Sequence, residues 1–274
     1  MAPRRTRLLP SRNTTRLARH HQHPRRHTTD LPAPHRRMID WARHRVLVIA
    51  PHPDDEAIGC GGLLSRITHA GGRAFVLWMT IADIRDYSAA GLSTSDQRYH
   101  ELRAAAEFWP LTGWHLARPG TDNLRLDTVA RHDLVDLIER GDHSVTLSEL
   151  RPTVVAIPDP TSYNQDHAAV AAAALTALRP GPGLYRHQPE LVLTYEQVGD
   201  CWNGQSHTST PTFFVELTPA DLDRKIAGLR LHESQWRDHP HTRSETAIRG
   251  LAALRGAQTG VDSAEAYRCL RLRA

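Results

Sequence analysis

Short runs of apolar residues alternate along the chain with longer segments of mixed polarity. The short runs are rich in β-branched residues, which is typical of strands that are covered on both faces of a sheet. They predict strands at 46–50, 74–79, 114–116, 153–157, 191–195 and 213–217. The mixed segments predict helices over 57–70, 95–108, 127–140, 166–178, 219–236 and 244–256.

Strands that alternate with helices favour a mainly parallel sheet with helices on both faces. We therefore expect an α/β fold with three layers, α/β/α, over residues 41–274. The chain has 274 residues, enough for one sizeable core in a domain of roughly 230 residues. No apolar run approaches the roughly 20 residues that a membrane span needs, so no membrane span is expected.

Positive charge is concentrated in residues 1–40, which hold ten arginines and two aspartates. The whole chain has a formal net charge of +4, so the rest is mildly acidic, with 24 basic and 28 acidic side chains. A specific nucleic-acid-binding face on residues 41–274 is therefore not expected. Residues 1–40 have almost no apolar periodicity, and we expect a disordered basic extension. A polyanion-binding protein driven by this extension is one rival interpretation.

The cysteines favour a reducing compartment. Cys60, Cys201 and Cys269 are too few and too scattered for a disulfide framework. An export signal would need an apolar stretch after the first arginine pair, and only a short Leu-Leu-Pro fragment follows. We therefore expect a cytoplasmic protein.

Two polar segments follow predicted buried strands. His52-Pro53-Asp54-Asp55-Glu56 comes after the strand at 46–50, and Asn164-Gln165-Asp166-His167 comes after the strand at 153–157. Open α/β sheets bind ligands at the carboxyl ends of their strands, so both segments are candidates for one site. Hydrolytic zinc sites use three His or carboxylate ligands and leave one position for water. A helix cap formed by the three adjacent acids is the structural alternative, which the second segment disfavours.

Together the two segments resemble the PIG-L/LmbE-like zinc-dependent N-deacetylases of amino sugars. The resemblance runs from about Val46 to Arg268, and its supporting stretches are Arg98-x-x-Glu101, His232-Glu233-Ser234-Gln235 and Ala264-Glu265-Ala266-Tyr267. It implies a Rossmann-like fold and one Zn²⁺ per chain. It also implies release of acetate from a small N-acetylated amino sugar or amino-sugar conjugate.

The resemblance also implies roles for individual residues. The metal ligands would be His52, Asp55 and His167, and Asp54 would be the general base. The substrate-binding residues would be Arg98, Tyr163, Asn164 and Asp166, and Asp166 is expected to orient Asn164 or the loop rather than the metal. Several family members carry histidine at the position of Asn164, where it can act as a general acid. Asn164 has no labile proton to give, so either Asp54 both removes and returns the proton, or Tyr163 or another group helps.

Less specific interpretations stay open for several of these residues. Arg98 and Glu101 lie one helical turn apart and would also suit a surface ion pair. His232 is expected to pack beside the site rather than bind the metal. Gly59-x-Gly61-Gly62 does not match the dinucleotide-binding spacing, and close helix packing explains it better. A Rossmann-like module that binds a sugar or nucleotide without hydrolysis is the alternative function, and metal analysis would distinguish the two.

Overall fold

The computed structural model describes residues 39–85, 91–183, 186–202 and 210–273. These residues belong to one compact unit, Ile39–Ala274. The basic extension predicted for residues 1–40 lies, apart from Ile39 and Asp40, outside the described residues. Among the described helices, none is both long and apolar enough to span a membrane.

A seven-stranded, mainly parallel sheet forms the centre of the unit, and six of its strands are those that the sequence predicts. Its spatial order is β5 (Gly113–Pro119), β2 (Arg73–Ile81), β1 (Arg45–Ala50), β6 (Val154–Pro158), β7 (Leu191–Tyr195), β9 (Ala264–Leu272) and β8 (Phe213–Glu216). The first five strands in this order are parallel, and β9 is antiparallel to both of its neighbours. A separate two-stranded sheet pairs β3 (Ile84–Arg85) with β4 (Leu92–Ser93).

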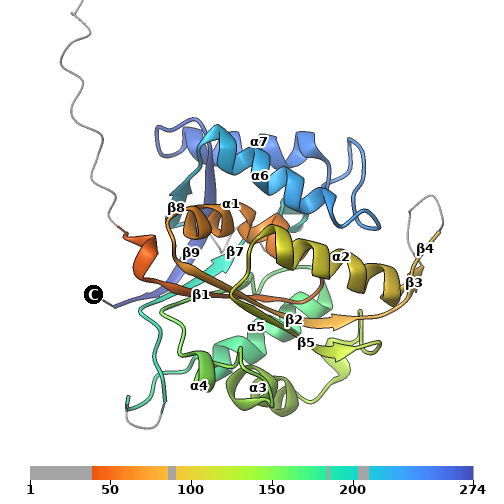
Figure 1. Ribbon diagram of the computed structural model, residues 1–274, viewed down its shortest axis with the longest axis vertical. Coiled ribbons are helices and arrows are strands. Elements are labelled where there is room, and N and C mark those ends of the chain that lie inside the picture. Colours follow the sequence, from red (N-terminus) through yellow and green to blue (C-terminus); the bar gives the residue numbers. More distant parts are fainter. Residues whose placement is uncertain (1–38, 86–90, 184–185, 203–209, 274) are drawn as a thin grey trace, which may run out of the picture. The chain divides into compact units, whose positions relative to one another are not determined.

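Helices cover both faces of the sheet (Figure 1). One face carries α1 (Asp55–His69), α2 (Ser95–Phe108), α6 (Pro219–Arg230) and α7 (Glu245–Ala257). The other face carries α3 (Arg131–Arg140), α4 (Leu147–Leu150) and α5 (Gln165–Ala177). Three short 3₁₀ helices complete the described elements: η1 (Trp41–Arg43), η2 (Leu126–Thr128) and η3 (Val198–Trp202). The three-layer α/β/α prediction is therefore confirmed.

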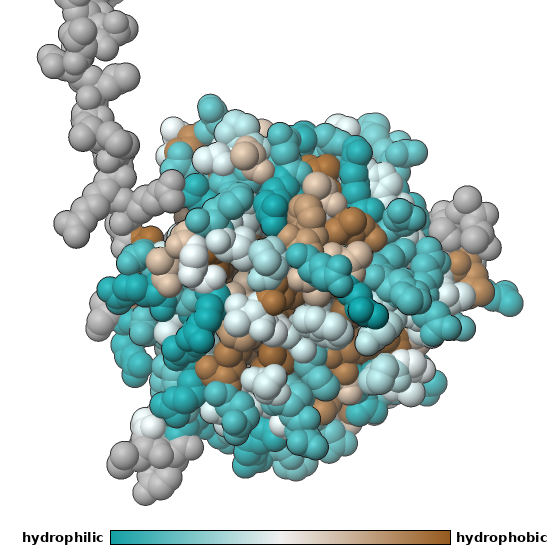
Figure 2. All heavy atoms as spheres, in the orientation of Figure 1, coloured by the Kyte–Doolittle hydropathy of each residue, from teal (hydrophilic) through white to brown (hydrophobic). Residues whose placement is uncertain are grey.

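The alternating side chains of β1 supply two separate hydrophobic cores. Val46 and Val48 face the layer of α1 and α6, whereas Leu47 and Ile49 face the layer of α3 and α5. All four side chains are fully buried, which explains why the sequence shows an unbroken apolar run here. Each such side chain contributes about 1.5–3 kcal/mol when removed from water. On the outside, polar residues cover most of the face seen in Figure 2 and hydrophobic residues show in scattered spots.

Several elements differ from the sequence prediction. The helix expected over 127–140 is divided into η2 and α3, and the short elements β3, β4 and α4 were not predicted. The helix expected over 219–236 ends at Arg230, because the following turn bonds to side chains of other elements instead: Ser234 N donates to Glu101 Oε1 (2.8 Å). The strand β9 was not predicted. Its segment alternates apolar residues with Glu265 and arginines, and a buried acid hides the strand pattern.

Glu265 is buried because several donors from other elements bond to its carboxylate. Lys225 Nζ of α6 lies 2.5 Å from Glu265 Oε1, and the backbone N–H groups of Gly62 and Leu63 in α1 donate to the same carboxylate. A Cβ on Gly61 would lie 2.8 Å from Lys225 Cγ, so glycine permits this close approach of α1 and α6. The Lys225–Glu265 ion pair therefore joins α1, α6 and β9.

We expect Lys225→Ala to lower the free energy of unfolding by about 3–5 kcal/mol, because it would leave the Glu265 carboxylate buried without its cation. Arg230→Ala is the matched control, since it removes an exposed ion pair with Glu245 that is worth about 0–1 kcal/mol. Urea unfolding measures both losses. Equal losses in the two variants would contradict the importance of the buried pair.

Candidate metal centre and active site

The two polar segments meet because β1 and β6 are adjacent parallel strands, whose carboxyl ends lie at the same edge of the sheet. After β1, a short turn containing His52 leads into α1 at Asp55. After β6, a loop leads into α5 at Gln165, which places His167 in the first turn of that helix. Both helices therefore begin beside this edge, and their first turns carry the candidate residues.

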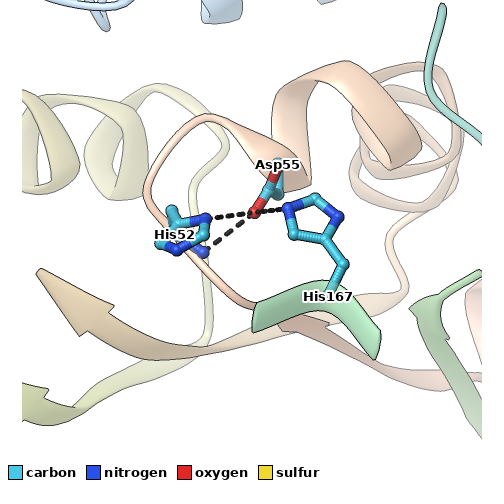
Figure 3. Close-up of side chains that lie close together, drawn as sticks. All are labelled: His52, Asp55 and His167. Atoms are coloured by element: carbon cyan, nitrogen blue, oxygen red, sulfur yellow. Dashed lines mark hydrogen bonds and ion pairs between the residues drawn. The ribbon is translucent and has the colours of Figure 1, made fainter. Parts of the chain in front are cut away.

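His52, Asp55 and His167 form a buried cluster whose candidate ligand atoms all lie within 4.8 Å of one another. His52 Nδ1 lies 3.4 Å from Asp55 Oδ2, and His167 Nε2 lies 3.3 Å from the same oxygen. Figure 3 shows the two imidazole rings on either side of the carboxylate. Two imidazole nitrogens and one carboxylate are a donor set that suits Zn²⁺. The residues present thus fit a metal ion of this kind.

Asp166 fixes the orientation of His52. The Nε2–H of His52 donates to Asp166 Oδ2 (2.7 Å), which leaves Nδ1 to face Asp55. Asp166 is fully buried, and its carboxylate also accepts the backbone N–H groups of Leu124 and Leu126. A metal-binding histidine usually donates its second ring N–H to a carboxylate, which fixes the orientation and tautomer of the ring. These contacts differ from the expected role of Asp166 in substrate binding, because its oxygens are already engaged within the protein.

The charges within the cluster shift the pKa values of His52 and Asp55 in the direction opposite to that of burial. Burial alone would lower the pKa of His52, but the hydrogen bonds to Asp166 and Asp55 outweigh it and raise this pKa to about 8. Burial would likewise raise the pKa of Asp55, yet His167 and His52 hold it well below its ordinary value. Asp55 is also bonded through Oδ1 to Gln197 Nε2 (2.6 Å). The cluster is therefore an anionic carboxylate held between two imidazole rings.

Asp54 and Glu56, which flank Asp55, have different partners. Asp54 is buried and lies 3.1 Å from Arg243 Nε through its Oδ2. Burial raises the pKa of Asp54, and the charge of Arg243 opposes that rise. Glu56 accepts hydrogen bonds from Asp54 N, Trp78 Nε1 and His232 Nε2. His232 thus packs behind Glu56 rather than within the metal cluster.

Arg98 and Glu101 are both buried and do not form a surface ion pair. Arg98 Nη2 donates to the Pro53 carbonyl (3.2 Å), next to Asp54. Glu101 accepts from the backbone N–H and the hydroxyl of Ser234. Both side chains of α2 therefore support the turns around the site.

Asn164 and Tyr163 lie on the loop before α5. Asn164 is the N-cap of that helix, and its Oδ1 accepts from the backbone N–H of Asp166 (2.9 Å). Tyr163 is 56% exposed, and its ring lies edge-to-face with Trp202, which is 74% exposed, at 5.8 Å between centroids. Neighbouring Ser162 donates to buried Asp200 (2.6 Å), which joins this loop to η3.

Sequence reasoning missed Gln197 and Arg243. Each lies far along the chain from the first segment, in a stretch that carries no recognised motif. Gln197 comes two residues after β7, a neighbour of β6, and the rule that ligands gather at strand ends is the one signal that points to it. Nothing comparable points to Arg243, which comes directly before Ser244, the N-cap of α7.

Comparison with known proteins identifies the relatives of this chain. The model of the GlcNAc-PI de-N-acetylase family, PIG-L, matches residues 47–178. Diacetylchitobiose deacetylase of Thermococcus kodakarensis is 25% identical over 229 residues, which cover 82% of each chain. The 1D-myo-inositol 2-acetamido-2-deoxy-alpha-D-glucopyranoside deacetylase of Corynebacterium glutamicum is 30% identical over 146 residues, 47% of this chain and 50% of that protein.

Solved structures share the fold. N,N′-diacetylchitobiose deacetylase from Pyrococcus horikoshii superposes with a TM-score of 0.61 at 21% identity, over 83% of this chain and 84% of that one. The 4-carboxy-2-hydroxymuconate hydratase GalB from Pseudomonas putida gives a TM-score of 0.62 at 19% identity, over 84% of this chain and 98% of that one. The fold alone therefore does not define the reaction. Together the comparisons show that residues 47–178 of this chain match the PIG-L family model and that its fold is the one seen in solved deacetylases.

Proposed function

We propose that the protein is a metal-dependent hydrolase that removes the acetyl group from an N-acetylated amino sugar or amino-sugar conjugate, releasing acetate and a free amine. The buried cluster of His52, Asp55 and His167 carries this proposal, because it lies within the matched residues and stands beside a further carboxylate, Asp54. The named activities of the relatives support hydrolysis over binding of a sugar or nucleotide without reaction. Cytoplasmic placement stays a prediction from the sequence.

The metal would be Zn²⁺, one per chain, held by His52 Nδ1, Asp55 and His167 Nε2. When bound, it would lower the pKa of a water ligand towards about 7 and polarise the acetamide carbonyl. Asp166 keeps His52 in the orientation and tautomer that this requires, and Gln197 restrains the Asp55 carboxylate.

Asp54 would take the proton from the attacking water. Of the other two carboxylates in the segment, Asp55 is a proposed metal ligand and Glu56 accepts from Trp78 and His232. The same residue would then return the proton to the leaving amine. Asn164 caps α5 through its side-chain oxygen and has no proton to give in this role. This arrangement assigns both proton transfers to Asp54.

Substrate contacts would come from the loops around the cluster. Tyr163 and Trp202 present exposed aromatic surface beside the segments that hold His167 and Gln197. Aromatic rings with a polar tip are well suited to a binding site that is partly wet, such as one for a sugar ring. Arg98 is buried against Pro53, and its contacts favour support of the Asp54 turn over direct contact with the substrate.

Acetate release from a panel of N-acetylglucosamine glycosides tests the function directly. We expect metal-loaded protein to release acetate and chelated protein to release none. Asp54→Asn should keep the metal and lower turnover by at least about 100-fold, because the general base is lost. His167→Ala should lose metal and turnover together. Near-normal turnover in Asp54→Asn would remove Asp54 from the mechanism, and full metal occupancy in His167→Ala would contradict its role as a ligand.

The position of Asp166 behind His52 gives a second test. We expect Asp166→Asn to lower metal affinity by about 10–100-fold, because the imidazole loses its orienting carboxylate. The measurement is competition with a chelating dye. At saturating metal the KM for substrate should stay close to that of the wild type. A raised KM with unchanged metal affinity would instead favour the substrate-binding role that the sequence predicts for Asp166.

Metal binding should also depend on pH through His52. Its pKa of about 8 means that His52 is mostly protonated at neutral pH in the metal-free protein, so a metal ion must displace the proton on Nδ1. The apparent metal affinity should therefore fall by about tenfold for each pH unit below 8. Dissociation constants measured at pH 6, 7 and 8 test this. An affinity that does not change over this range would contradict it.

A further inference from the structure

Asp54 has a strained backbone. Its φ of 119° and ψ of −27° lie in a region that a residue with a side chain rarely adopts. Such strain costs about 1–3 kcal/mol and persists only where the surroundings hold it. Several contacts restrain the backbone here: Asp54 N donates to Glu56 Oε2, the Asp54 carbonyl accepts from Ile58 N (2.9 Å), and the preceding Pro53 carbonyl accepts from Arg98.

The carboxylate of Asp54 has its own restraint. Arg243 Nε lies 3.1 Å from Asp54 Oδ2 as an ion pair. Among the described residues, no donor is aligned for a hydrogen bond to this oxygen. Arg243 therefore holds the carboxylate by charge and leaves the lone pairs of Oδ2 able to accept a proton.

Arg243 is itself fixed in place. Its Nη1 donates to Gln235 Oε1 (3.0 Å), and the amide of Gln235 donates in turn to Ser234 Oγ (3.1 Å). Ser234 is bonded to Glu101 of α2, and the next residue after Arg243, Ser244, caps α7. The guanidinium is thus set between the Gln235 turn and Asp54, with about a third of the side chain (34%) open to solvent.

We propose that Arg243 is a positioning residue that holds the Asp54 carboxylate in the orientation needed for proton transfer. The proposal rests on the proposed function, because it assigns a role to a partner of the proposed base. A guanidinium suits the task, since Nη1 donates to Gln235 while the delocalised charge at Nε stays beside Asp54 Oδ2. Lysine has one point charge on a flexible stem and would satisfy one of these contacts at a time.

The test compares Arg243→Ala and Arg243→Lys with the wild type, using acetate release by zinc-loaded protein. We expect Arg243→Ala to lower kcat by about 100-fold, because a misplaced catalytic group costs about that much. KM, zinc content and melting temperature should stay close to wild type. The kcat of Arg243→Lys should lie between that of the wild type and that of Arg243→Ala. Arg230→Ala, which removes an exposed arginine of α6, should leave kcat unchanged.

Two further measurements separate positioning from a general structural effect. Added guanidinium at millimolar concentration should restore part of the kcat of Arg243→Ala and none of that of Asp54→Asn. The double variant Asp54→Asn/Arg243→Ala should be no slower than Asp54→Asn alone, because Arg243 acts through Asp54.

Several results would overturn the proposal. A raised KM with unchanged kcat would make Arg243 a substrate contact. Independent, multiplying losses in the double variant, or loss of zinc from both Arg243 variants, would show that it does not act through Asp54. If the wild type releases no acetate from any glycoside, the proposed function fails and this role fails with it. If the wild type is active and Arg243→Ala is equally active, this proposal alone fails.

Discussion

Three consecutive carboxylates, Asp54, Asp55 and Glu56, are buried where α1 begins, and the rest of the site is organised around them. Burying one carboxylate is costly, and burying three together is possible only if each has partners of its own. The start of a helix helps, because its free N–H groups and dipole favour negative charge. The main compensation, however, comes from side chains of distant segments.

These partners differ from one carboxylate to the next. Asp55 lies between two imidazole rings, Glu56 between Trp78 and His232, and Asp54 next to Arg243. The same arrangement separates their chemistry. Asp55 is one of the three proposed metal ligands, and Glu56 accepts from three donors. Asp54 keeps Oδ2 free of aligned hydrogen bonds among the described residues. His232 and Arg243 both lie beyond residues 47–178, so the C-terminal part of the chain completes a site that the matched family segment begins.

The fold and the meeting of the two polar segments could be predicted because both depend on local patterns, and the resemblance then named His52, Asp55 and His167 as the candidate cluster. The apolar run of β1 requires cover on both faces, and the strand-end rule brings His52 and His167 to one edge. Strand β9 could not be predicted, since the buried Glu265 breaks its apolar pattern. The donors that make its burial possible, Lys225 and the N–H groups of Gly62 and Leu63, lie far from it along the chain. Arg243 could not be predicted either, because its partner is chosen by tertiary packing and not by spacing along the chain.

Lys225 is the one lysine in the sequence, and it is buried against α1 and β9. A reagent that modifies side-chain amines can therefore reach it only when α6 separates from these elements. Cleavage by a lysine-specific protease is limited in the same way. Covalent labelling of this lysine side chain therefore reports directly how often α6 opens away from α1.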